Sequence, residues 1–277
     1  MSGPAAAREV TPEDAVGLLD GLTAIVARAA AATLVRPGPE VARRYKPDQS
    51  PVTSADEASE AVILDGLTRL IPGLPVVAEE SVGRGRAAVG KSVAIVDPLD
   101  GTKEFIAGRD EFTVNLAIVT RGAPVAGLIA APAQGMLWRG VIGSGAERLK
   151  MRWADGAISE RIAIRTRRAP DRLVVAVSRS HMDKDSEAWL GRFPSTERYP
   201  CGSSLKFCHL AEGKADLYPR LGPTSEWDIA AGCAILAAAG GTVIAPDGST
   251  LRFGTGGTFR VPGFIAWGDP ERAARAP

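Results

Sequence analysis

The chain has 277 residues, of which 45% are hydrophobic and 23% are charged, proportions that are ordinary for a globular enzyme. Its 33 basic and 32 acidic residues leave a net charge of +1, which argues against a general electrostatic attraction to nucleic acid. Three cysteines without CxxC spacing argue against a disulfide framework, and two histidines are too few for most zinc-hydrolase sites.

The N-terminal residues Met1–Pro4 lack the basic and apolar segments of a secretion signal, so we expect a cytoplasmic protein. The most apolar helix candidate, residues 24–35, carries Arg28 and is too short to cross a bilayer. No transmembrane segment is therefore expected. Peripheral attachment at the inner face of the membrane and the oligomeric state stay open.

The first half of the chain begins with two helices and continues with strands. Thr11 as N-cap and Pro12 at the first helical position predict the start of the first helix. A loop rich in proline and charge (37–51) leads to a capping box at Ser54–Glu57, which opens a helix ending near Pro72. Strand-like runs follow at residues 75–80, 93–97, 113–119, 123–130 and 136–142.

Strands and helices alternate in the second half. Strands are expected at residues 173–178, 242–245 and 264–267, and helices at 183–192, 204–212 and 228–239. Antiparallel strands followed by alternating units predict an α/β (α+β) fold of two joined layers. We expect an N-terminal subdomain of residues 1–140 and a C-terminal subdomain of residues 141–277.

The most informative stretch is Asp97-Pro98-Leu99-Asp100-Gly101-Thr102, which follows an apolar strand. Positions three apart on a regular strand face opposite sides, so Asp97 and Asp100 could not share a ligand there. Pro98 cannot donate to a ladder and Gly101 permits a positive φ, which predicts a turn. A turn would bring both carboxylates and the Leu99 carbonyl together, as a hard divalent cation requires.

Two further acidic clusters lie at the ends of predicted elements. Glu79 and Glu80 end a buried strand, and Asp228 opens an alanine-rich helix. Each alone is explained by a solvated strand end or a helix cap, but the three clusters together predict a multi-metal site. Asp56 lies in the first turn of its helix, where the helix dipole favours its ionised form.

These residues resemble the inositol monophosphatase superfamily of Mg²⁺-dependent phosphatases. The resemblance lies in Glu79-Glu80-Ser81, Asp97–Thr102 and Trp227–Gly232, and it covers residues 50–241. Three segments are similar to its 3′(2′),5′-bisphosphate nucleotidase branch: Lys103-Glu104-Phe105, Ser178–His181 and Gly202–Lys206. The resemblance implies a layered α-β-α-β-α sandwich of the sugar-phosphatase type, with the active site between two subdomains. It also implies the substrate adenosine 3′,5′-bisphosphate, hydrolysed to AMP and phosphate.

The resemblance also assigns roles to particular residues. It implies two or three Mg²⁺ ions, a catalytic pair formed by Asp56 and Thr102, and water as the attacking group. The implied metal ligands are Glu79, Asp97, the Leu99 carbonyl, Asp100 and Asp228. The implied substrate contacts are Gly101, Thr102, His181, Gly202, Ser203, Lys206 and Asp228. The role of Glu80 stays open: it either contacts the residues that bind the ions or binds a third ion itself.

Two alternatives to this hypothesis stay open. An inositol monophosphatase or a fructose-1,6-bisphosphatase-like enzyme would carry the same metal motif. A non-catalytic nucleotide sensor would bind without turnover, and loss of a metal ligand or of the Asp56–Thr102 pair would favour it. Neither loss occurs in this sequence. The expected partner is a small nucleotide bisphosphate and not a nucleic acid.

Overall fold

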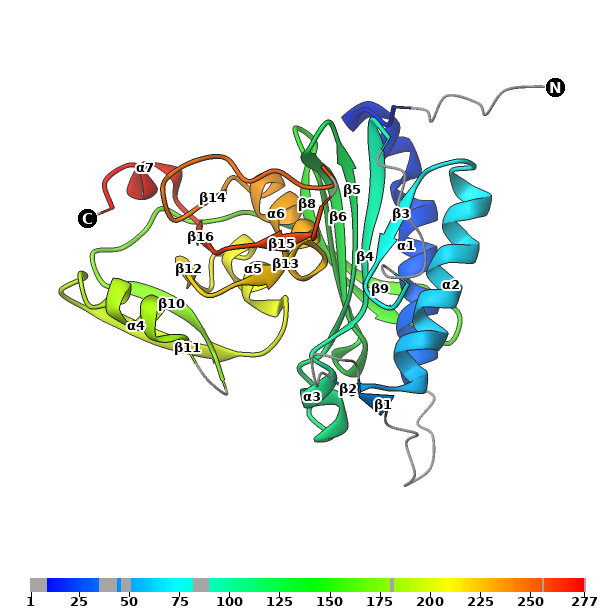
Figure 1. The fold of residues 1–277 in the computed structure, drawn as a ribbon, viewed down its shortest axis with the longest axis horizontal. Helices are drawn as coiled ribbons and strands as arrows, with labels where there is room; N and C mark the ends of the chain where they lie inside the picture. Colours follow the sequence, from blue (N-terminus) through cyan, green and yellow to red (C-terminus); the bar gives the residue numbers. More distant parts are fainter. Residues whose placement is uncertain are drawn as a thin grey trace.

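The computed structural model describes residues 9–34, 44–45, 51–81, 90–179, 182–255 and 257–276. Its elements form five layers that alternate helix, sheet, helix, sheet and helix (Figure 1). This arrangement confirms the predicted layered α-β-α-β-α sandwich. From the outer side of the larger sheet onward, the helical layers consist of α1 (Pro12–Leu34) with α2 (Ser54–Leu70), α5 (Leu205–Ala211) with α6 (Glu226–Ala238), and α4 (Lys184–Leu190) with α7 (Pro270–Ala273).

The larger sheet has seven strands in the order β3-β4-β5-β6-β7-β8-β9. Strand β3 runs parallel to β4, and every other neighbouring pair in this sheet is antiparallel. The strands are β3 (Val76–Ala78), β4 (Ser92–Asp100), β5 (Thr113–Thr120), β6 (Ala123–Ala131), β7 (Met136–Val141), β8 (Gly145–Arg152) and β9 (Ala157–Ile164). A short helix α3 (Thr102–Ile106) follows β4, and a 3₁₀ turn (Pro132–Gln134) joins β6 to β7.

The central strands of this sheet are buried on both faces, and their side chains alternate between two cores. Ala94 and Val96 of β4 face α1 and α2, whereas Val93 and Ile95 face the helical layer between the sheets. We call these the outer and inner faces. Since alternation continues along β5, Ala117 and Val119 belong to the inner face. The next positions on the inner face, Asp97 of β4 and Asn115 of β5, are polar.

The smaller sheet is mixed, in the order β11-β10-β12-β16-β14. Its parallel pairs are β10 with β11 and β10 with β12, and β16 is antiparallel to both β12 and β14. Its strands are β10 (Leu173–Ser178), β11 (Thr196–Cys201), β12 (Leu217–Arg220), β14 (Thr242–Ile244) and β16 (Phe264–Trp267). Two short pairs lie outside the sheets: β1 (Arg44–Tyr45) with β2 (Pro51–Val52), and β13 (Thr224–Ser225) with β15 (Arg260–Val261).

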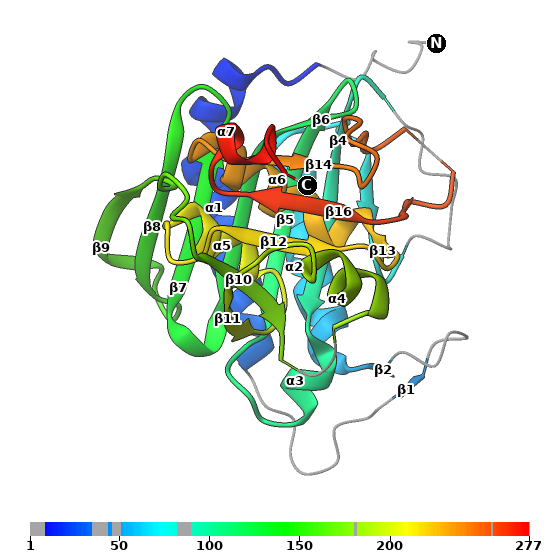
Figure 2. The same ribbon diagram turned by 90° about the vertical axis from the view of Figure 1, so that its left-hand side faces the viewer.

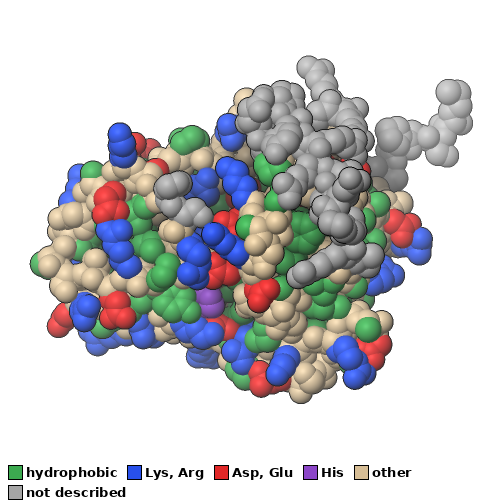
Figure 3. Space-filling model, turned by 90° about the horizontal axis from the view of Figure 1, so that it is seen from below, with side chains coloured by type: hydrophobic (Ala, Val, Ile, Leu, Met, Phe, Trp, Pro, Cys, Tyr) green, Lys and Arg blue, Asp and Glu red, His purple; other side chains and the backbone are tan. Residues whose placement is uncertain are grey.

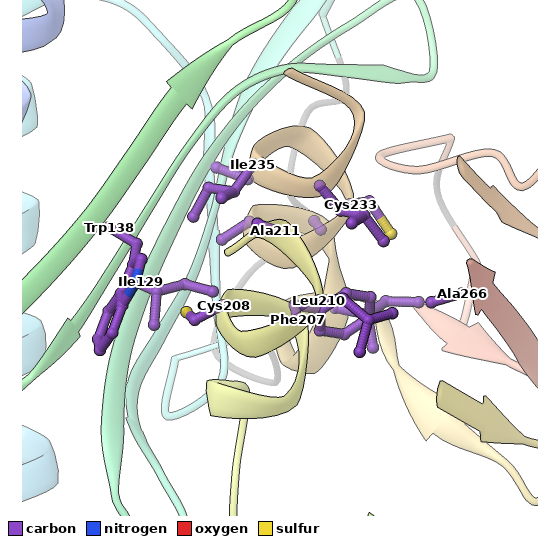
Figure 4. Close-up of a cluster of buried hydrophobic side chains, with 14 of the residues drawn as sticks. Ile129, Trp138, Phe207, Cys208, Leu210, Ala211, Cys233, Ile235 and Ala266 are labelled. Carbon is purple, nitrogen blue, oxygen red and sulfur yellow. The ribbon is translucent and has the colours of Figure 1, made fainter. Parts of the chain in front are cut away.

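Helices α5 and α6 fill the space between the sheets, and in Figure 2 they lie behind strands β12 and β16. Figure 4 shows Cys233 and Ile235 of α6 and Phe207 of α5 packed between Ile129 and Trp138 on one side and Ala266 on the other. Helix α6 approaches β6 so closely that a Cβ at Gly127 would collide with the Ala231 carbonyl. The two sheets therefore share one continuous core.

Most predicted elements are confirmed within a few residues. The predicted position of the α2 capping box was wrong by one residue. The N-cap is Thr53 and not Ser54, and its capping-box partner is Asp56. Strands β8, β9, β11 and β12 and the short pairs β1–β2 and β13–β15 were not predicted, and β1 lies within the stretch expected to be a loop. Strand β9 is exposed over seven of its eight residues, so it has no apolar alternation for the sequence to display.

Helix α1 is longer than the predicted apolar segment. It has 23 residues and is long and apolar enough to span a membrane by length and composition alone. Its buried residues, among them Leu22, Val26 and Ala30, belong to the core on the outer face of the larger sheet. In this structure α1 is a core helix.

The division into subdomains at residue 140 stays a prediction. Strands β8 and β9 lie beyond that residue and still belong to the larger sheet. A division that follows the sheets would fall between Ile164 and Leu173.

Candidate active site

A β-bulge places Asp97 and Asp100 on the same face of the larger sheet. Asp97 is paired with Asn115 of β5 and Asp100 with Thr113, so the register shifts by one residue between them. The prediction that the strand ends in a turn after Asp97 was therefore wrong. Strand β4 continues to Asp100, and the extra residue of the bulge turns the Asp100 side chain to the inner face. The Ser59 hydroxyl of α2 donates to the Pro98 carbonyl at 2.7 Å, which fastens the bulge from the outer side.

The chain after the bulge turns into the short helix α3. Gly101 is its N-cap, with a φ of +89° that favours glycine, and a Cβ there would collide with the Ser203 hydroxyl. Thr102 is the first helical residue. Its Oγ1 lies 3.2 Å from the Leu99 carbonyl oxygen and 3.3 Å from Asp56 Oδ1. The structure therefore brings together the predicted catalytic pair from two helices.

Asp56 is fully buried and is held by its own helix start. Its Oδ2 accepts hydrogen bonds from the Thr53 amide at 2.8 Å and the Thr53 hydroxyl at 2.6 Å. Its other oxygen faces Thr102. The capping box thus fixes one carboxylate oxygen and presents the second to the site.

The turn Gly202-Ser203-Ser204 joins the second half of the chain to Asp100. The Ser204 amide and hydroxyl lie 2.7 Å from Asp100 Oδ2, both as donors. Ser203 adopts a φ of +49°, and its hydroxyl lies 2.8 Å from the Glu111 carbonyl oxygen and 3.1 Å from that of Asp100. The Gly202 amide donates to Glu111 Oε2 at 3.1 Å. Gly202 and Ser203 therefore lie beside Asp100, and their role as substrate contacts stays a prediction.

Asp228 occupies the third position of α6 and not its N-cap. Its Oδ2 accepts hydrogen bonds from the Ser225 amide at 3.0 Å and from the Thr224 hydroxyl. Its carbonyl oxygen lies 2.9 Å from the Ser204 hydroxyl. The first turn of α6 thus meets the turn that binds Asp100.

Burial and neighbouring acidic side chains raise the pKa of Asp97 and of Asp228. Burial is the largest cause that raises the pKa of Asp97 well above its usual value, followed by the charges of Glu79, Asp100 and Asp228. Burial and the charge of Asp100 raise the pKa of Asp228, against the hydrogen bond from Ser225 and the charge of Arg220. These four carboxyl groups are therefore electrostatic neighbours, from elements far apart in the sequence.

The oxygen atoms of these carboxyl groups are the kind of ligand that a hard cation prefers. Within the described ranges, no group of three or more His, Cys, Asp or Glu side chains is close enough together to hold a metal as it stands. The acids are nevertheless neighbours, and the Asn115 side-chain oxygen is buried without a hydrogen-bond partner in the same part of the chain. Carboxylate, carbonyl and amide oxygens are the ligands that Mg²⁺ prefers. The identity of the ligands stays a prediction.

A cavity of about 160 Å³ opens beside Asp100 and Asp228. It is lined by residues of both halves, including Gly101, Glu104, Ser203 and Lys206. A second cavity of about 280 Å³ shares four lining residues with the first: Ser178, Lys206, Tyr218 and Arg220. In Figure 3, which views the molecule from the side on which α3 lies, Lys and Arg side chains gather near the middle of this face.

Lys206 lies in the site and is not a solvated surface lysine. Its side chain is buried, and its Nζ donates to the Ser203 carbonyl at 2.8 Å and the Cys201 carbonyl at 3.3 Å. The ammonium also lies 5.2 Å from the centre of the Tyr218 ring. His181 lies outside the described residues.

Sequence reasoning missed several residues of the site. Arg220 ends β12, a strand that was not predicted, and lines both cavities. Glu111 pairs with Arg179, with Nε–Oε2 and Nη2–Oε1 distances of 2.8 and 2.5 Å, and this pair lowers the pKa of Glu111. The predicted segment Ser178–His181 contained Arg179, but its partner could not be read from the sequence.

We expect Mg²⁺ to raise the melting temperature of the protein. Binding to the folded state alone stabilises it by about 2.7 kcal/mol at a hundredfold excess over Kd. For a protein of this size that corresponds to roughly 5–10 °C. Calorimetric scans in EDTA and in millimolar Mg²⁺ measure the shift, and equal melting temperatures would contradict a metal site among these acids.

The metal-free protein should also show a pH dependence caused by Asp97. Because its folded-state pKa is raised, the folded state binds more protons than the unfolded state between the ordinary and the raised value. This contribution to stability therefore falls as pH rises through that interval and is constant above it. Carboxyl groups with lowered pKa, such as Glu111, change stability in the opposite direction. The difference between wild type and Asp97→Asn in EDTA isolates the Asp97 contribution.

Comparisons with known proteins agree with this geometry. The sequence model of the inositol monophosphatase family matches residues 13–274. A 3′(2′),5′-bisphosphate nucleotidase CysQ of Escherichia coli K12 is 41% identical over 221 residues, which are 79% of this chain and 86% of that protein. The CysQ of Salmonella typhimurium is 42% identical over the same shares.

Solved structures show the same fold. The crystal structure of CysQ from Bacteroides thetaiotaomicron aligns with a TM-score of 0.75 and 34% identity, covering 90% of this chain and 97% of that one. An IMPase from Thermotoga maritima aligns with a TM-score of 0.73 at 23% identity, covering 93% and 94% of the two chains. The second likeness concerns the fold alone.

Proposed function

This chain belongs to the inositol monophosphatase family, and we propose that it is a 3′(2′),5′-bisphosphate nucleotidase that hydrolyses the 3′-phosphate of adenosine 3′,5′-bisphosphate. The products are AMP and phosphate. The observation that carries the proposal is the 41% identity to a CysQ nucleotidase over most of both chains. The convergence of Asp97, Asp100 and Asp228 beside a cavity with Lys206 and Arg220 supports it.

The family is generally Mg²⁺-dependent, and this chain offers oxygen donors for such ions. We assign the ligands to the Leu99 carbonyl and the carboxylates of Glu79, Asp97, Asp100 and Asp228, for two or three ions in total. Bound Mg²⁺ would supply Lewis-acid activation of water and stabilisation of charge on the transferring phosphoryl group. The bonds from Ser204 to Asp100 and from Ser225 to Asp228 orient these carboxylates.

Asp56 and Thr102 provide a route for the proton of the attacking water. Thr102 Oγ1 donates toward Asp56 Oδ1, so it can accept a proton while it passes its own to the carboxylate. The capping box holds Asp56 in this orientation before substrate arrives. The backbone amides of Gly101 and Thr102 are assigned to the transferring phosphate.

The second phosphate of the substrate is assigned to the basic side of the cavities. Lys206 and Arg220 line both cavities, and so does Tyr218, whose ring centre lies 5.2 Å from Lys206 Nζ. Gly202, Ser203 and His181 complete the proposed substrate contacts. We also propose that the protein acts in the cytoplasm, on a small nucleotide.

A substrate panel tests the proposal. Adenosine 3′,5′-bisphosphate, inositol 1-phosphate and fructose 1,6-bisphosphate are compared by kcat/KM, with Mg²⁺ and with EDTA. The expected result is a clear preference for the nucleotide and loss of activity in EDTA. A preference for either sugar phosphate would contradict the nucleotidase assignment, and tight nucleotide binding without turnover would indicate a sensor.

Replacing Lys206 should reduce the preference for two phosphates. Lys206→Met keeps the buried aliphatic chain and removes the charge. A hydrogen bond to a charged group contributes about 1.5–3 kcal/mol, so kcat/KM for the bisphosphate should fall about 10–100-fold relative to that for adenosine 3′-monophosphate. Lys214→Met is the matched control, because Lys214 pairs with Glu212 outside the cavities. Equal losses on both substrates would contradict the assigned role.

A further inference from the structure

Asn115 is a buried amide at the point where the inner face of the larger sheet changes from apolar to polar side chains. It is 1% exposed and lies in β5 between the fully buried Val114 and Leu116. Farther along the same inner face, Ala117 and Val119 are apolar, as is its β6 neighbour Ile129. Burying an amide costs free energy unless its hydrogen bonds are made, so a specific contact must account for it.

That contact reaches the second half of the chain. Asn115 Nδ2 donates to the Ser204 hydroxyl oxygen at 2.8 Å, across 89 positions of sequence. A hydroxyl has one proton, and the amide already occupies an acceptor position of Ser204. The Ser204 proton is therefore directed to its remaining neighbours, Asp100 Oδ2 at 2.7 Å and the Asp228 carbonyl at 2.9 Å.

Asn115 also lies beside Asp97, one of the acids assigned to the metal. Asn115 is the cross-strand partner of Asp97, and paired residues of antiparallel strands share a face with Cβ atoms about 4.5–5.5 Å apart. Its Oδ1 has no hydrogen-bond partner within the described part of the chain. The amide thus stands between Asp97 and the serine that binds Asp100.

We propose that Asn115 is a positioning residue that orients Asp100 through Ser204 and so tunes the affinity of the site for Mg²⁺. This inference rests on the proposed function, because it assigns a role toward the ion that function requires. Partners of metal ligands set the orientation of the ligands, and their loss typically costs about 10–100-fold in metal affinity or activity. Asn115 lines neither cavity itself and contacts the first only through Ser204, so it acts through its neighbours.

The test compares Asn115→Leu, Ser204→Ala and the double variant with wild type. Calorimetric titration with Mg²⁺ alone, without nucleotide, measures the ion affinity. We expect Asn115→Leu to weaken it about 10–100-fold and to lower kcat without raising KM for the nucleotide. The double variant should lose little more than the larger single loss, because both residues act through one chain of bonds. Ile118→Val, on the opposite face of β5, is the matched packing control.

Unchanged Mg²⁺ affinity in Asn115→Leu, or fully additive losses in the double variant, would overturn the proposal. If Asn115→Leu does not fold, Ser204→Ala carries the same test, since it leaves the Ser204 amide bond to Asp100 in place. A wild-type protein that binds Mg²⁺ but does not hydrolyse the nucleotide would contradict the proposed function instead. The ion titration separates the two failures.

Discussion

An Asp97→Asn variant should fold, melt at a higher temperature than wild type in EDTA, and hydrolyse its nucleotide roughly 10³-fold more slowly in Mg²⁺. The asparagine oxygen can still accept the Leu99 amide, which donates to Asp97 Oδ1 at 3.0 Å. Removing the buried charge relieves repulsion from Glu79, Asp100 and Asp228. A bound metal ion stabilises the charge of the transition state by several kcal/mol. Because each 1.36 kcal/mol of lost stabilisation slows the reaction tenfold, losing a metal ligand should lower the rate by roughly 10³-fold.

Two measurements check this result. Scanning calorimetry in EDTA gives the melting temperatures, and steady-state kinetics in Mg²⁺ gives kcat. The exposed Asp110, in the loop between α3 and β5, provides the control variant Asp110→Asn. A lower melting temperature in EDTA, or activity close to wild type, would show that Asp97 is not part of a charged metal site.

Asp56→Asn should abolish most turnover with little effect on the fold. The asparagine oxygen can replace Oδ2 as acceptor of both Thr53 bonds, so the cap of α2 is kept. Its amide nitrogen would then face Thr102 and donate where the carboxylate accepted. Loss of a general base costs about 10²–10⁴-fold, which we expect in kcat with KM unchanged.

The control for Asp56→Asn is Thr53→Ala. This change removes a cap hydroxyl and lowers stability by about 1 kcal/mol, but it leaves Asp56 Oδ1 opposite Thr102. It should melt earlier and lose far less kcat than Asp56→Asn, because the Thr53 amide still holds Asp56 Oδ2. If Thr53→Ala lost as much turnover as Asp56→Asn, the effect would come from the helix start and not from proton transfer.

The sequence predicted the parts of the fold that carry strong local patterns. Strands β4, β5 and β6 are long apolar runs, and α1 and α2 begin with recognisable caps. Strand β11 was missed because only one of its six residues is buried, and β12 because Pro219 interrupts a run of four residues. Their identity as strands comes from pairing with distant chain, which no local pattern encodes.

The same limit applies to the site. The acids Asp97, Asp100 and Asp228 were predicted as ligands because each lies in a specific motif next to a predicted strand or helix. The way in which Asp97 and Asp100 come to one face was predicted wrongly, because the bulge depends on pairing with Thr113 of another strand. Arg220 and Asn115 were missed, since a single basic or amide residue in a strand carries no signal until its neighbours are known.

Helix α6 has a consequence for how the molecule assembles. It carries Asp228 in its first turn and continues through Ala230, Ile235 and Leu236 in the core that both sheets share. Neither sheet can complete its interior without it, so the polypeptide should unfold in a single cooperative transition. Chain cleaved between β9 and β10 would yield fragments that acquire stable structure only when mixed, and hydrolytic activity would return at the rate at which they associate.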